Sequence, residues 1–86
     1  MGVDEVDEAQ LRKVVNEVSK GMGEHLRIKR IVTYAADGKR YINIDCCFTK
    51  HIQIKKAHSV ASQVEKETKE RFANAVVTVH IEPECS

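Results

Sequence analysis

Four side chains in this 86-residue sequence could bind a metal ion if the fold brought them together: Asp45, His58, His80 and Glu82. Imidazole nitrogens and carboxylate oxygens are ligands that zinc and other borderline divalent ions accept. His80 and Glu82 stand two residues apart in VTVHIEP, so in a β-strand they would point to one face. None of the spacings is that of a zinc finger. Taken alone, a histidine on an exposed strand face indicates a polar surface residue, and His58 indicates a half-buried helix histidine bonded to a backbone carbonyl.

Two apolar stripes with helical spacing predict the helices around these residues. The first helix would be capped by Asp4 or Asp7 and would end at Gly21–Gly23. Its stripe consists of Leu11, Val14, Val15, Val18 and Met22. The second helix would run over residues 54–72, exit at Asn74, and carry His58 beside its stripe. That stripe consists of Ile54, Ala57, Ala61, Val64, Thr68 and Phe72.

Three segments rich in β-branched residues predict strands at residues 26–34, 40–48 and 76–82, with a hairpin turn at Asp37-Gly38. In the second strand the core face would consist of Ile42, Ile44, Cys46 and Phe48. The other face would consist of Tyr41, Asn43, Asp45 and Cys47. In the last strand Val77, Val79 and Ile81 would face the core, opposite to His80 and Glu82.

The order helix, strand, strand, helix, strand predicts one α+β domain over residues 1–86. The expected fold is an open-faced αββαβ sandwich with two helices on one face of a three-stranded sheet. The crossover before the last strand makes it parallel to one of the others, and in a ferredoxin-like arrangement it lies beside the first. His80 would then point away from the helices while His58 lies on one. They could meet only at a sheet edge or end, or a partner subunit would supply one ligand.

Composition excludes several functions. Fourteen Lys and Arg against 13 Asp and Glu give a net charge of +1, which argues against nucleic-acid binding. No apolar run is long enough for direct membrane insertion. Three cysteines without an export signal predict free thiols in a reducing compartment. Neither a phosphate-binding loop nor a nucleophile elbow is present, so we expect no enzyme.

From Gly38 onward the sequence resembles the cytoplasmic C-terminal domain of the cation diffusion facilitator (cation efflux) family, which exports divalent ions. The resemblance lies in the strand INID, the Ala-His pair that opens AHSVASQVEKETKERF, and the ending of VTVHIEP. It implies a metallochaperone-like fold, a homodimer, a cytoplasmic location and attachment to a membrane transporter domain. It also implies a divalent ion near the subunit interface, with zinc expected first and manganese or iron as alternatives.

The resemblance transfers three metal ligands by position: His58, His80 and Glu82. Asp45 stands where the family often has a histidine and is a harder ligand. Lys29 stands where a histidine commonly opens the first strand, and its charge would oppose a metal ion. Cys47 shares the face of Asp45 and could add a thiolate, although a surface thiol is the simpler interpretation.

Three functions compete at this point. The first is a metal-sensing dimerisation domain, in which ion binding draws two subunits together and the movement passes to a membrane domain. The second is a metal-free structural dimerisation module, in which His80 and Glu82 hydrogen-bond across the interface. The third is a free-standing soluble metal carrier, although an exposed Cys-x-x-Cys loop typical of carriers is absent.

Overall fold

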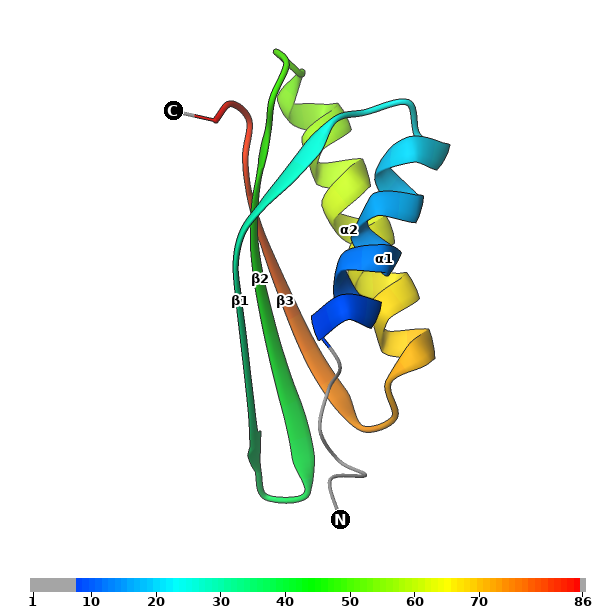
Figure 1. Cartoon of the computed structure of the whole chain (residues 1–86), viewed down its shortest axis with the longest axis vertical. Coiled ribbons are helices and arrows are strands. Elements are labelled where there is room, and N and C mark those ends of the chain that lie inside the picture. The colour runs from blue at the N-terminus through cyan, green and yellow to red at the C-terminus, as the bar shows by residue number, and fades with distance from the viewer. Residues whose placement is uncertain (1–7, 86) are drawn as a thin grey trace.

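The computed structural model describes residues 8–85. Its elements are α1 (Glu8–Gly21), β1 (Leu26–Ala36), β2 (Lys39–Phe48), α2 (Ile54–Arg71) and β3 (Ala75–Glu82). Both helices lie on one face of the sheet, and the opposite face carries no helix (Figure 1). The predicted αββαβ sandwich is therefore confirmed. The predicted helix caps Asp4 and Asp7 lie outside the described residues.

The strand order is β1-β2-β3, with β2 antiparallel to β1 and parallel to β3. The expectation that the last strand lies beside the first was wrong. β2 is the most deeply buried strand, with Ile42 and Ile44 fully inaccessible to solvent. A central strand forms backbone hydrogen bonds along both edges. This placement therefore gives partners to the N–H and C=O groups of the strand that has least access to water. β3 consequently becomes an edge strand.

The hairpin between β1 and β2 turns at Asp37 and Gly38, as predicted, and both have positive φ (53° and 73°). Positive φ at both central residues is the requirement of a type I′ turn. Farther along, the β1–β2 register shifts between Ile28 and Arg30, so Lys29 is an additional residue in β1. This bulge lies at the end of the sheet where Asp45 and Cys47 are found.

The core fills the space between the helices and one face of the sheet. α1 contributes its predicted stripe, and β2 contributes Ile42, Ile44, Cys46 and Phe48. In α2 the prediction was wrong for Ile54, which is 65% exposed, and it missed Val60, which is fully buried. Ile54 opens the helix, where the first turn reaches beyond the packed centre. None of the described helices is long and apolar enough to cross a membrane.

Two isoleucines in opposite environments test this account of the core. We expect Ile42→Ala to lower the free energy of unfolding by about 2–5 kcal/mol, because it leaves a cavity in a packed interior. Ile54→Ala, at a site 65% exposed, should change it by about 0.5 kcal/mol or less. Urea denaturation of both variants measures the difference. Equal losses would contradict the central placement of β2.

Candidate metal site

The free edge of β3 brings together two of the sequence-predicted ligands. α2 packs against β3, and its first turns extend over the end of that strand (Figure 1). A pocket of about 260 Å³ forms there. It is lined by Ile54, Ala57, His58, Ala61, Val79, His80, Ile81 and Pro83. His58 and His80 thus meet at the edge of the sheet within one subunit, although their elements present opposite faces.

Both histidines are exposed, so solvent and ions reach their side chains. The rest of the pocket wall is apolar. Apolar surroundings lower the local dielectric, which strengthens the attraction between a cation and the few polar groups present. Two imidazoles in an otherwise apolar pocket have the donor chemistry for a borderline divalent ion. Whether they bind one stays a prediction.

Asp45 lies next to His80 on the uncovered face of the sheet. The two residues are paired in the parallel β2–β3 register. The Oδ2 atom of Asp45 is 3.7 Å from the Nε atom of Arg30, which pairs with Asp45 in the β1–β2 register. Asp45 is therefore a strand neighbour of His80, and part of its charge is already balanced by Arg30.

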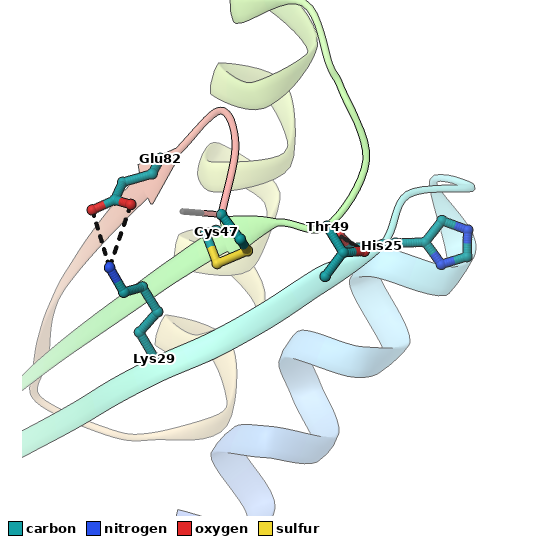
Figure 2. The surroundings of a disulfide bond; sticks show 6 residues. His25, Lys29, Cys47, Thr49 and Glu82 are labelled. Carbon is teal, nitrogen blue, oxygen red and sulfur yellow. Dashed lines mark hydrogen bonds and ion pairs between the residues drawn. A yellow bond between two sulfur atoms is a disulfide. The ribbon is translucent and has the colours of Figure 1, made fainter.

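Glu82 forms an ion pair with Lys29, the residue whose positive charge was expected to oppose a metal ion. The Nζ atom of Lys29 donates to both carboxylate oxygens of Glu82, at 3.3 and 3.4 Å (Figure 2). The bulge in β1 contributes Lys29 at this point. The two side chains are 44% and 54% exposed, and exposed ion pairs contribute only about 0–1 kcal/mol. An ion can therefore displace Lys29 from Glu82 at small cost.

The four predicted ligands do not form a complete site. Among residues 8–85, no three His, Cys, Asp or Glu side chains are placed to hold one ion. The structure brings His58 and His80 to one pocket and sets Asp45 beside His80, while Glu82 lies farther along β3 beside Lys29. Structural zinc sites use four ligands, so this arrangement supplies about half of a site.

The cysteines depart from the sequence expectation. Cys47 and Cys85 form a disulfide with their Cα atoms 5.0 Å apart, so the prediction of free thiols was wrong for both. Cys47 is 2% exposed, and the expected surface thiol was also wrong. The segment after β3 folds back over β2, where the Cys85 amide donates to the Phe48 carbonyl at 2.8 Å. Closing a loop across 38 residues contributes about 3–4 kcal/mol to stability.

The remaining cysteine, Cys46, is a free thiol on the core face of β2 and is 1% exposed. Burial, aided by the nearby charge of Asp45, raises the pKa of the Cys46 thiol to about 11. The thiolate is the reactive and metal-binding form of cysteine, so Cys46 is chemically inert near neutral pH.

Residues 3–84 match the family described as cation efflux protein, cytoplasmic domain. A search of curated proteins found no match.

Solved structures share the fold at low sequence identity. A structure of CzrB, described as a candidate zinc transporter, is 16% identical with a TM-score of 0.70, covering 94% of this chain and 100% of that one. Its zinc form is 17% identical, with a TM-score of 0.71 and coverages of 94% and 92%. The metal-bound C-terminal domain of the CzcD transporter from Thermotoga maritima is 22% identical, with a TM-score of 0.67 and coverages of 88% and 90%.

The difference in thiol reactivity between Cys46 and Cys85 can be measured by alkylation of the reduced, folded protein. We expect Cys85, which is half-buried in the C-terminal segment, to react near neutral pH. Cys46 should stay unlabelled until the protein unfolds or the pH approaches 11, where its thiolate forms. Mass spectrometry of the labelled peptides reports both rates. Equally fast labelling of the two at neutral pH would contradict the buried position of Cys46.

Proposed function

The chain belongs to the cation efflux protein family, as its cytoplasmic domain, and on that premise we propose a regulatory dimerisation domain that binds a divalent ion at His58 and His80. The observation that carries this proposal is the pocket shared by the two histidines at the edge of β3. Zinc is the expected ion because it accepts imidazole ligands readily, and related proteins of this fold are described as zinc-bound or metal-bound. These domains are parts of transporters, and no catalysis is proposed.

The remaining ligands come from neighbouring groups. Asp45 lies beside His80, and Glu82 becomes available when an ion displaces Lys29. The site also lies at the rim of the uncovered face, where a second subunit would approach and could supply a ligand. A site that is incomplete in one subunit and complete in a closed dimer binds its ion more tightly in the closed arrangement. Ion binding then favours closure by that difference in affinity.

The uncovered face of the sheet has an apolar region for a second copy of the chain. Val32, Tyr34 and Val76 are 39%, 51% and 38% exposed. The registers place all three on this face, near the β1–β2 hairpin. Tyr34 stacks on Tyr41 with ring centroids 4.9 Å apart, which forms a rigid aromatic surface. Aromatic and apolar groups of this kind form the centres of protein interfaces.

Dimerisation can be tested with a charge placed on each face of the molecule. Analytical ultracentrifugation should show a dimer of the 9.7 kDa chain. Tyr34→Glu should shift it towards monomer, because a carboxylate would be buried against the partner without a counter-charge. Ser62→Glu adds the same charge to an exposed position on α2 and should leave the dimer intact. A monomeric wild-type protein, with and without zinc, would refute the proposed interface.

Metal binding can be tested at His80. Zinc should raise the melting temperature of the wild-type protein, since binding to the native state stabilises it by RT ln(1 + [L]/Kd). His80→Ala should abolish most of that increase and leave the melting temperature without zinc nearly unchanged, because the side chain is exposed. Differential scanning calorimetry of the oxidised protein measures both quantities, with the cysteines excluded as ligands.

His51→Ala is the matched control, since this exposed histidine lies in the loop before α2, away from the pocket. It should leave the zinc-induced increase in melting temperature intact.

A metal-free dimerisation module would respond differently to the same His80 variant. In that case His80→Ala would weaken the dimer without zinc, and zinc would stabilise neither protein. One observation favours this second function. Asp45 pairs with Arg30 and Glu82 pairs with Lys29, so two of the carboxylates that a metal ion would need are already occupied.

A further inference from the structure

The Cys47–Cys85 disulfide borders an open hollow at one end of the sheet. The hollow has a volume of about 290 Å³ and is lined by Arg27, Ile28, Lys29, Cys47 and Cys85. This volume is near the lower end of the range for small-molecule sites, about 300–1,000 Å³. Cys47 is 2% exposed, whereas Cys85 is half-buried. A small molecule in the hollow therefore has better access to the disulfide from the side of Cys85.

The charged groups that line the hollow are both cations, Arg27 and Lys29. Arg27 is opposite Cys47 in the β1–β2 register, so the two side chains lie on the same face of the sheet. Within residues 8–85, Arg27 takes part in none of the ion pairs. The whole chain has a net charge of only +1, so this positive charge is a local feature. Local cations of this kind attract anionic small molecules.

Lys29 is partly engaged by a carboxylate outside the hollow. Its Nζ atom is 3.3 Å from Glu82, beside the disulfide (Figure 2). Glu82 does not line the hollow, and exposed ion pairs are weak. A carboxylate that enters the hollow can therefore compete with Glu82 for Lys29. The hollow thus offers one cation without a partner among the described residues and one that is shared.

Glutathione has the chemical groups that this hollow would recognise. It bears two carboxylates and one thiol, and carboxylates form charge-assisted hydrogen bonds with guanidinium and ammonium groups. It is also one of the agents that keep thiols reduced in the cytosol. The family that this chain matches is described as a cytoplasmic domain. A disulfide beside two cations in such a domain is exposed to an anionic thiol.

We propose that the hollow is a site of thiol–disulfide exchange with a small thiol that bears carboxylates, such as glutathione, and that Cys85 is the residue it modifies. Arg27 and Lys29 bind the carboxylates while the thiol meets the sulfur of Cys85. The expected product is a mixed disulfide between Cys85 and the small thiol. No metal ion takes part in this exchange.

The hollow is separate from the other proposed surfaces. His58 and His80 line a different pocket. The Tyr34–Tyr41 stack of the proposed dimer interface lies towards the hairpin, and Tyr41 precedes Cys47 by six residues or about 20 Å along β2. A dimer formed through that aromatic surface therefore leaves the hollow open to solvent.

The exchange needs no oxidant, because the small thiol supplies the electrons. Its thiolate attacks the sulfur of Cys85, forms the mixed disulfide and breaks the bond to Cys47, which leaves as a thiolate and takes a proton from the solvent. A second small thiolate attacks the small-molecule sulfur of the mixed disulfide and expels Cys85 as a thiolate. The products are a small disulfide and the reduced protein, so two electrons pass from two small thiols to the protein disulfide.

The rates at which three thiols of different charge reduce the oxidised full chain test the proposal. Glutathione is anionic, 2-mercaptoethanol is neutral and cysteamine is cationic. A chelator is present throughout, so that metal ions play no part. Acid quenching, alkylation and mass spectrometry measure the fraction of disulfide that remains. For each thiol the rate of a variant is divided by the wild-type rate, so the intrinsic reactivity of the thiol cancels.

Arg27→Gln should lower the glutathione rate about fivefold, the effect of one charge contact at about 4 Å in water. It should raise the cysteamine rate and leave the 2-mercaptoethanol rate nearly unchanged. Lys39→Gln is the matched control, because it removes the same charge from an exposed position eight residues before Cys47 along β2. It should change none of the three rates. Three rates that shift together in Arg27→Gln, or a glutathione rate that does not fall, would overturn the proposal.

Glu82→Gln tests the competition for Lys29. This variant should raise the glutathione rate, because Lys29 loses its carboxylate partner and becomes available to the small thiol. Lys29→Gln should lower the same rate. A glutathione rate that is unchanged or lower in Glu82→Gln would contradict the assigned role of Lys29.

Peptide mapping identifies the modified residue. Wild-type protein quenched with acid early in the glutathione reaction should carry glutathione on the peptide of Cys85 and not on that of Cys47. In Cys47→Ala, which cannot close the protein disulfide again, glutathione disulfide should add one glutathione to Cys85. Glutathione on Cys47, or none on Cys85 in either experiment, would overturn the proposal. None of these outcomes bears on the histidine site, whose test is the zinc response of the oxidised protein.

Discussion

The central position of β2 is the constraint on which the other features depend. Ile42 and Ile44 of this strand are fully buried, and its two edges are paired with β1 and β3. β3 is therefore an edge strand, and the first turns of α2 extend over it. His58 from the helix and His80 from the outer face of the strand can meet only at such an edge. The proposed metal site is thus a consequence of strand order.

Cations from β1 regulate the charge of the uncovered face. The bulge at Lys29 lets two successive basic residues of β1 reach carboxylates on β2 and β3, Arg30 to Asp45 and Lys29 to Glu82. These pairs reduce the negative charge available to an ion, so at the proposed site the imidazoles of His58 and His80 would contribute most of the binding. Lys29 also lines the hollow beside the Cys47–Cys85 disulfide, together with Arg27.

Local patterns in the sequence predicted the local structure well. The two helices, the turn at Asp37-Gly38 and the core faces of β2 and β3 follow from periodicity and turn chemistry. Strand order did not follow, because apolar alternation is the same for either neighbour of β3. The disulfide was missed because three cysteines without an export signal indicated free thiols. The β2–β3 register pairs Cys47 with Glu82, three residues before Cys85, and so brings the two cysteines close together. The meeting of His58 and His80 also depends on β3 being at an edge.

The most direct test of the histidine site is anomalous diffraction at the zinc absorption edge, from crystals of the oxidised protein grown with zinc. Oxidation removes Cys47 and Cys85 as ligands, and Cys46 is buried. We expect an anomalous peak with one nitrogen of His58 and one of His80 at about 2.0–2.1 Å from the zinc ion. A zinc ion bound to only one of these histidines, or bound elsewhere with the pocket vacant, would contradict it.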